Sequence, residues 1–189
     1  MKEVIKKHIL EHRAVLDSII NLEDSLGGIA DLLVKCLKKE GTVFWCGNGG
    51  SSSDSQHLAG ELLGRFETDR KPLKSISLNS DSSVMTCISN DYGYDHVFER
   101  QIEGLGRKGD VLIGISTSGN SVNVNKSFQA ANNKMIDTVA FLGRDGGAAI
   151  NIAKRSILIP SFSTARIQEM HILIGHILCD LIERGLEVK

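Results

Sequence analysis

Five short apolar runs after Gly41 constrain most strongly how this chain can fold. The runs are TVFWCG, SISLNS, DVLIGIS, DTVAFLG and RSILIPS, and segments with the spacing of helices lie between them. Continuous apolar strands that alternate with helices form a parallel sheet whose two faces are both covered. The sequence therefore predicts a doubly wound α/β fold with about five strands. Ligands of such sheets bind in the loops beyond the carboxyl ends of the strands.

The residues before Gly41 have a helical pattern. The segment LGGIADLLVKCLKKEG ends on two lysines and a glycine, which is typical of a helix C-terminus. Two interpretations of the first helix stay open, because it can pack against a partner subunit or fold back onto its own sheet. We expect one domain over residues 1–189, made of a helical segment at 1–40 and an α/β core at 41–189.

The composition argues against several classes of partner. Acidic and basic residues nearly balance, with a formal net charge of −1, and both signs are interspersed along the chain. Neither a nucleic-acid footprint nor a polybasic membrane patch is visible. The N-terminus lacks the apolar core of a signal peptide, and no apolar run approaches the roughly 20 residues that span a bilayer. The four cysteines have no CxxC spacing, so we expect a cytoplasmic protein with reduced thiols.

Two loops of small polar residues connect apolar runs to helices. TVFWC leads into GNGGSSS and a helix from about Asp54 to Arg65, and DVLIGI leads into STSGNS and a helix from about Val122. Free N–H groups and the positive end of the helix dipole favour an anion at such a junction. Glycines let the backbone approach a ligand closely, and hydroxyls add donors.

Neither loop matches the two best-known nucleotide motifs. A P-loop needs a lysine after its glycines, and the dinucleotide fingerprint needs a third glycine where this chain has Ser52. A phosphate on a small metabolite remains as the ligand, beside the plainer possibility that both loops are ordinary turns.

Two helices carry residues that can bind a metal. His57 and Glu61 are four residues apart and share one helix face, while Gln168 and His176 are two turns apart in the final helix. Imidazole and carboxylate are ordinary zinc ligands, and a glutamine carbonyl is an uncommon one. From spacing alone, the first pair also fits a solvent-facing helix and His176 also fits a buried core histidine. Spacing does not bring the two helices together.

Four long motifs supply a family resemblance over nearly the whole chain. They are CGNGGSSSDSQHLAGELLGRF, SNDYGYDHVFERQIEGLGRKGDVLIGISTSGNS, GRDGG and ARIQEMHILIGHIL. The sequence resembles the SIS (sugar isomerase) fold family and, within it, the sedoheptulose 7-phosphate isomerases, also called phosphoheptose isomerases. The resemblance implies a three-layer SIS fold with a five-stranded parallel sheet. It also implies a homotetramer, with N-terminal helices used for oligomerisation and active sites at subunit interfaces.

The same resemblance implies a reaction and a set of site residues. The reaction converts D-sedoheptulose 7-phosphate to D-glycero-D-manno-heptose 7-phosphate through a zinc-assisted enediol, for the heptose of bacterial lipopolysaccharide or surface polysaccharide. Glu61 and His176 would be the acid–base pair, with one zinc ion per subunit. The implied zinc ligands are His57, Glu61, Gln168 and His176. The implied substrate contacts are Asn48, Gly49, Gly50, Glu61, Asn90, Asp91, Ser116, Thr117, Ser118, Ser121 and Gln168.

One departure and two rival functions follow from the resemblance. Some of these isomerases carry an aspartate where this chain has Ala165, so one polar contact near the site is in question. A non-catalytic branch, an adaptor for the bacterial replication initiator, shares RFETDR and ARIQEMH but tends to lose the residues at the positions of Glu61 and His176. An isomerase of another sugar phosphate would share the anchoring loops. The four implied zinc ligands favour the heptose enzyme.

Overall fold

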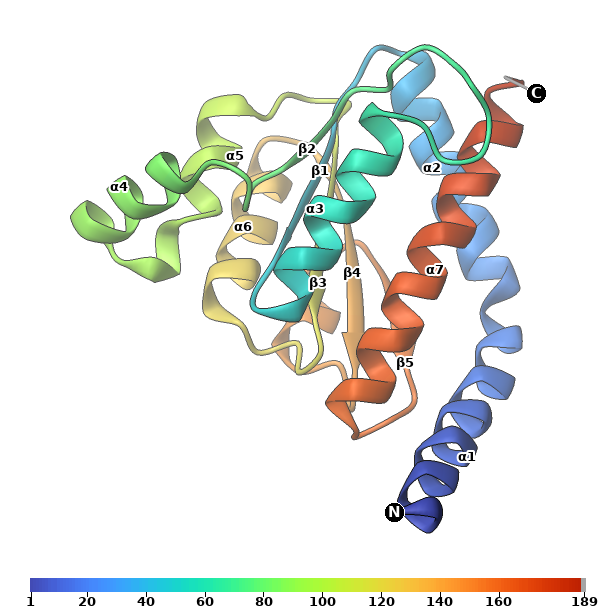
Figure 1. Cartoon of the computed structure of the whole chain (residues 1–189). Helices are drawn as coiled ribbons and strands as arrows, with labels where there is room; N and C mark the ends of the chain where they lie inside the picture. The colour runs from blue at the N-terminus through green and yellow to red at the C-terminus, as the bar shows by residue number, and fades with distance from the viewer. Residues whose placement is uncertain (188–189) are drawn as a thin grey trace.

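The computed structural model describes residues 1–187 (Figure 1). Its element order confirms the expected one of two helices, then alternating strands and helices, then a closing helix. In chain order the elements are α1 (Lys2–Ser18), η1 (Ile19–Leu22), α2 (Glu23–Lys38), β1 (Val43–Gly47), α3 (Gly50–Leu63), β2 (Ser75–Ser77), α4 (Ser82–Tyr92), η2 (Tyr94–His96), α5 (Glu99–Leu105), β3 (Val111–Ser116), α6 (Val122–Asn133), β4 (Asp137–Gly143), η3 (Ala148–Asn151), β5 (Arg155–Ile159) and α7 (Thr164–Gly185).

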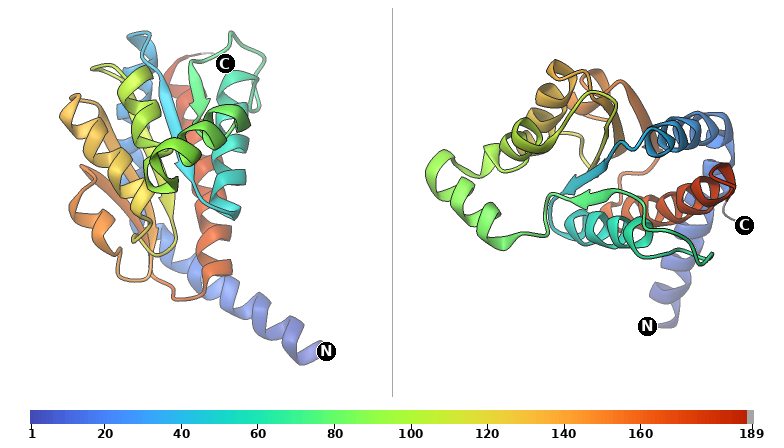
Figure 2. Two further views of the ribbon diagram at one scale, coloured as in Figure 1. Left: turned by 90° about the vertical axis from the view of Figure 1, so that its left-hand side faces the viewer. Right: turned by 90° about the horizontal axis from the view of Figure 1, so that it is seen from above.

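The five strands form one parallel sheet in the order β2-β1-β3-β4-β5, as the sequence predicted. Successive side chains of a strand point to opposite faces, so Trp45 packs with α2, α3 and α7, while its neighbour Phe44 packs with α5 and α6. These two apolar clusters make the three layers of the fold, which Figure 2 shows from above. The strand order reverses between β1 and β3, and the loops that leave their carboxyl ends diverge there.

The two N-terminal helices behave differently. α2 buries Leu26, Ile29 and Leu33 against the sheet layer, whereas α1 leaves all of its residues partly or fully exposed. α1 extends beyond the rest of the molecule in both views of Figure 2. Polar contacts link α1 to the start of α7, including one of 2.7 Å between His12 Nδ1 and Glu169 Oε2. The helix that stands outside the core is therefore α1, and the helix that folds onto the sheet is α2.

One predicted boundary is wrong. The helix expected from about Asp54 to Arg65 runs instead from Gly50 to Leu63, so the serines expected in the loop form its first turn. The reason is that Gly49, at φ 56°, makes the turn alone, and the Ser52 N–H already bonds the Gly49 carbonyl at 3.1 Å. Within the described part of the chain, no helix is long and apolar enough to cross a membrane.

Candidate active site

A cavity of about 300 Å³, here called the anion pocket, lies where the loops after β1 and β3 diverge. Three helix N-termini meet at it, because α3 and α7 begin at Gly50 and Thr164 and Ser121 precedes α6. Their free N–H groups and dipoles favour a negative charge in this space. The lining residues are Asn48, Gly49, Gly50, Ser51, Ile115, Ser116, Thr117, Ser121, Thr164 and Gln168.

Close backbone approaches shape the anion pocket. A Cβ atom on Gly50 would lie 2.5 Å from Gln168 Nε2, so the glycine makes room for the amide of α7. A Cβ atom on Gly119, which has φ 66°, would lie 1.9 Å from the Gly146 carbonyl oxygen. The GRDGG motif therefore supports the STSGNS loop through backbone packing. Within that loop the hydroxyls of Ser116 and Ser121 are 3.0 Å apart.

The Asn48 side chain is fixed by its neighbours. Its amide exchanges two hydrogen bonds with the buried amide of Asn123, at 2.8 and 2.9 Å. The Tyr94 hydroxyl donates a third bond to Asn48 Oδ1 at 2.9 Å. The loop after β1 is thus held by α6 and η2, which limits the conformations it can adopt.

Three of the four predicted metal ligands lie together and form what we call the ligand triad: His57, Glu61 and His176. His57 Nε2 lies 2.9 Å from His176 Nε2 and 3.4 Å from Glu61 Oε1. One candidate ligand atom from each residue lies within 4.8 Å of the other two. Gly175 explains how two helices meet here, because a Cβ atom on it would lie 2.5 Å from Leu58 in α3.

The ligand triad fits a zinc ion by its chemistry and its spacing. Zinc–nitrogen and zinc–oxygen bonds of about 2.1 Å in tetrahedral geometry separate neighbouring ligand atoms by about 3.4 Å. The His57–His176 and His57–Glu61 separations, 2.9 and 3.4 Å, are close to that value. Two imidazoles and a carboxylate are also an ordinary donor set for zinc. Burial raises the pKa of Asp54, one turn before His57, and the nearby imidazole lowers it in part.

The remaining predicted residues lie elsewhere. Gln168 belongs to the anion pocket, about 12 Å from His176 along the axis of α7, and its part in metal binding stays a prediction. Asn90 and Asp91 lie at the exposed end of α4, where the Asn90 amide donates to Asp91 at 2.8 Å. The hydroxyl of Ser118 accepts from the Asn120 N–H at 3.2 Å and is outside the described set that lines the pocket.

Two histidines of α7 have contrasting surroundings. His171 is fully buried, its Nε2 lies 3.1 Å from the Leu142 carbonyl, and burial lowers its pKa to about 4. His176 is half-buried and faces His57. From the sequence, His176 could have been a buried core histidine. In the structure, His171 is the histidine of that kind.

Thr164, Asn123 and Phe66 are among the residues of these sites that sequence reasoning missed. Thr164 lines the anion pocket, and it follows the fifth apolar run through another small polar loop, so the rule that found the first two loops could have found it. Asn123 pairs with Asn48 across 75 residues of chain. The Phe66 ring stacks on His176 at 5.6 Å between centroids and 25° between planes. The spacing of residues along the sequence does not indicate that Asn123 or Phe66 belongs to these sites.

Comparison with known proteins gives one consistent result. The family model of the SIS domain matches residues 8–143. A phosphoheptose isomerase of Helicobacter pylori is 51% identical over 187 residues, which are 98% of this chain and 97% of that protein. One from Sulfurimonas denitrificans is 47% identical over 189 residues, with 98% and 97% covered. The structure of the phosphoheptose isomerase from Neisseria gonorrhoeae superposes with a TM-score of 0.92 at 41% identity, covering 97% of this chain and 98% of that one.

Proposed function

Because the chain belongs to the SIS domain family and to the phosphoheptose isomerases within it, and is therefore an isomerase, we propose that it interconverts D-sedoheptulose 7-phosphate and D-glycero-D-manno-heptose 7-phosphate with the help of a zinc ion. The observation that supports the zinc-dependent reaction is the ligand triad, because two distant helices bring His57, Glu61 and His176 together. A binding module has no need of a carboxylate beside two imidazoles, so the adaptor function is disfavoured.

The spacing of the two sites suits a long substrate with a phosphate at one end. Gln168 in the anion pocket and His176 in the ligand triad are eight residues apart in α7, about 12 Å along its axis. A seven-carbon sugar phosphate carries its phosphate and its reacting carbons at opposite ends. The hydroxyls and helix N-termini of the pocket would bind the phosphate and fix the sugar's position.

Aldose–ketose isomerisation requires a base and an acid at adjacent carbons. Glu61 would remove the proton from C1 of the ketose and return it to C2, and His176 would move a proton between the two oxygens. A bound zinc ion would supply a Lewis acid for the carbonyl oxygen. An imidazole nitrogen that binds a metal cannot also give a proton, so His176 would perform one of its two tasks at a time. No aspartate stands at Ala165 to share the proton transfers.

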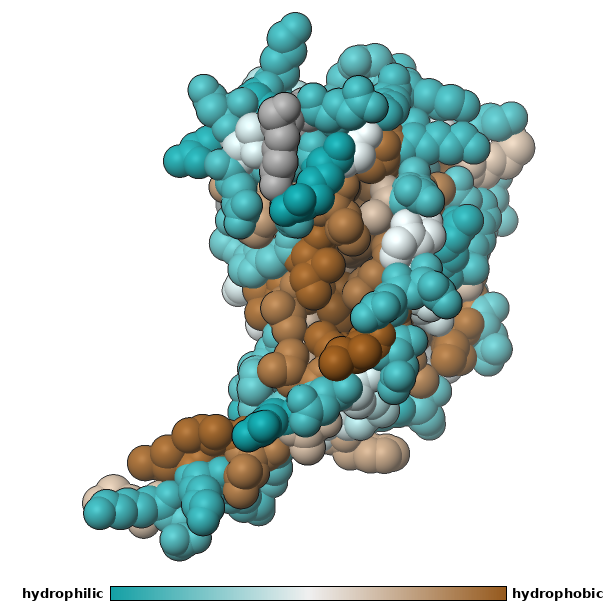
Figure 3. All heavy atoms as spheres, turned by 90° about the vertical axis from the view of Figure 1, so that its right-hand side faces the viewer, coloured by the Kyte–Doolittle hydropathy of each residue, from teal (hydrophilic) through white to brown (hydrophobic). Residues whose placement is uncertain are grey.

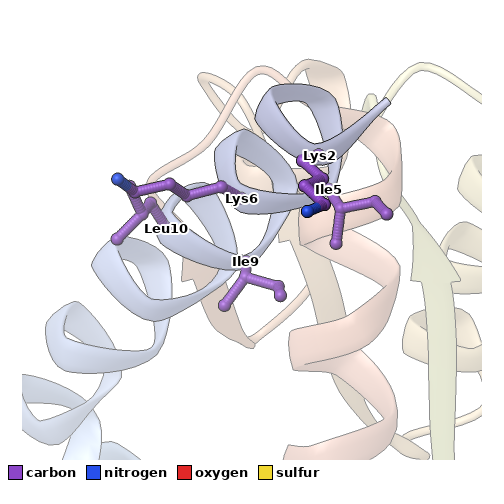
Figure 4. A pocket seen from close by; sticks show the side chains of 5 residues that line it. All are labelled: Lys2, Ile5, Lys6, Ile9 and Leu10. Atoms are coloured by element: carbon purple, nitrogen blue, oxygen red, sulfur yellow. The ribbon is translucent and has the colours of Figure 1, made fainter.

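We propose further that the chain forms a homo-oligomer through its α1 face. Figure 4 shows Ile5, Ile9 and Leu10 of α1 lining one open cavity together with two lysines, and Ile5 and Ile9 are 60% and 61% exposed. A groove of about 630 Å³ between α7 and the η1–α2 segment is a second apolar surface, visible as the brown strip in Figure 3. Exposed apolar surfaces of this size are typical of a protein interface. The family resemblance favours a tetramer with active sites between subunits.

Light scattering after size exclusion tests the oligomer. The native chain should elute as a tetramer, and Ile5→Lys combined with Ile9→Lys should shift it to smaller species. Lys7→Gln changes an exposed residue of the same helix that lies outside the set in Figure 4, and it should leave the mass unchanged. A monomeric native chain would contradict the interface.

An assay with purified protein tests the reaction. The chain should convert sedoheptulose 7-phosphate to its aldose and leave a pentose phosphate unchanged. Binding to the replication initiator without turnover would favour the adaptor, and turnover of the pentose phosphate would favour the other isomerase. We also propose that the product supplies the heptose of bacterial lipopolysaccharide or surface polysaccharide, as the resemblance implies, and that the enzyme is cytoplasmic.

A further inference from the structure

A fully buried ion pair lies next to the ligand triad without belonging to it. Arg70 lies in the loop between α3 and β2, Glu183 lies near the end of α7, and their side chains are 1% and 0% exposed. Arg70 Nε donates to Glu183 Oε1 at 2.9 Å. A buried pair is costly to desolvate, so its hydrogen bonds to the surroundings indicate what it holds in place.

The Arg70 guanidinium caps the C-terminal end of α3. Its two terminal nitrogens donate to the carbonyls of Glu61 and Leu62, both at 2.9 Å. The last carbonyls of a helix have no partner within the helix, and a cation there also complements the helix dipole. The turn that Arg70 holds is the one that carries the Glu61 carboxylate.

The Glu183 carboxylate holds the loop itself. It accepts the backbone N–H groups of Phe66 at 3.1 Å, Glu67 at 3.3 Å and Thr68 at 2.9 Å. Glu183 and His176 are seven residues apart in α7 and share one helix face. The loop therefore lies along that face, and the Phe66 ring reaches back to stack on His176.

From these contacts we propose that the Arg70–Glu183 pair is a positioning unit for the isomerase reaction. It fixes Glu61 through the α3 carbonyls and His176 through the Phe66 ring, so the two proposed acid–base groups share one support. The proposal rests on the proposed function for its kinetic consequences, while the coupling between the pair and the His176 ring stands on geometry alone. It also gives a role to the last arginine of RFETDR.

Three substitutions test the proposal in the full-length protein. Arg70→Lys keeps the charge beside Glu183 but replaces a planar fork by a single ammonium, which cannot cap two carbonyls in the same way. Phe66→Leu removes the ring and leaves the backbone N–H for Glu183. The matched control is Arg184→Lys, because Arg184 forms an exposed ion pair with Asp180 on the same helix.

Turnover and the His176 ring are the two measurements. In Arg70→Lys and Phe66→Leu we expect kcat to fall by about 10- to 100-fold while KM for sedoheptulose 7-phosphate stays within about twofold, because misplaced reacting groups reduce turnover. The control should keep both constants. The ring-proton signals of His176 in the NMR spectrum should shift in the two variants and not in the control, at a temperature where all of them are folded.

The outcomes separate this proposal from the proposed function. A native chain without isomerase activity would contradict the function, and the His176 signals would still test the coupling. Unchanged His176 signals and unchanged kcat in Phe66→Leu would overturn the positioning role, even if Arg70→Lys failed to fold. A rise in KM at constant kcat would also overturn it, because it would assign the pair to substrate binding.

Discussion

The anion pocket and the ligand triad are built in different ways. The pocket consists mainly of loop residues and helix N-termini next to strand ends, so each part follows from a few neighbouring residues. The triad exists only because α3 and α7 pack closely at Gly175, more than a hundred residues after His57. Local sequence thus encodes the proposed phosphate site, whereas tertiary packing assembles the proposed reacting groups. Substitutions should affect the two regions in separable ways.

The largest effect should come from Glu61→Gln, which keeps the shape of the side chain and removes its basicity. We expect kcat to fall by about 100- to 10,000-fold, the range for loss of a general base. The melting temperature should stay close to that of the native chain, because the Glu61 side chain contributes no core packing. Glu67→Gln removes an exposed carboxylate six residues further on and is the control. Near-native turnover of Glu61→Gln would remove Glu61 from the role of base.

His171 should make the stability of the protein depend on pH independently of both sites. Its pKa is about 4 in the folded chain and about 6.5 when unfolded, so only the unfolded chain gains this proton between those values. Stability should therefore fall as the pH falls from 6.5 to 4, by about 3 kcal/mol from this group. Urea unfolding at pH 7, 5.5 and 4 should show that His171→Gln loses less unfolding free energy than the native chain does. Equal losses of stability in both proteins would show that folding does not lower the pKa of His171.

The smallest effect distinguishes two serines of one loop. Ser121 lines the anion pocket, so Ser121→Ala should weaken substrate binding by about 1–3 kcal/mol through the lost bond to a charged phosphate. Ser118 was predicted to contact substrate as well, but its hydroxyl lies outside the described lining. Ser118→Ala should change binding by less than about 0.5 kcal/mol. The Michaelis constants of the two variants measure the difference. A larger increase for Ser118→Ala than for Ser121→Ala would contradict the assignment of the anion pocket as the phosphate site.

The sequence predicted the fold well because its signals are local. Apolar runs of strand length, the glycine of the first loop and the presence of a final helix were all visible, and the structure confirms the five-stranded parallel sheet. The start of α3 was misjudged because serines suit both a loop and a first helical turn. Periodicity could propose His57 with Glu61 but could not join them to His176, which needed the family resemblance. Nothing local indicates that the Arg70 side chain in its loop is buried, because its partner Glu183 lies more than a hundred residues later, in α7.

If the ligand triad holds the metal on which turnover depends, metal content and activity must change together. The direct measurement is the metal content of the purified chain, determined together with its isomerase activity before and after chelation and again after zinc is added back. We predict one zinc ion per chain, loss of activity in step with loss of the metal, and recovery of activity when zinc is added back. His57→Ala should bind less metal than the native chain, whereas the control Gln56→Ala should bind as much. Full turnover by a chain freed of metal would contradict the account.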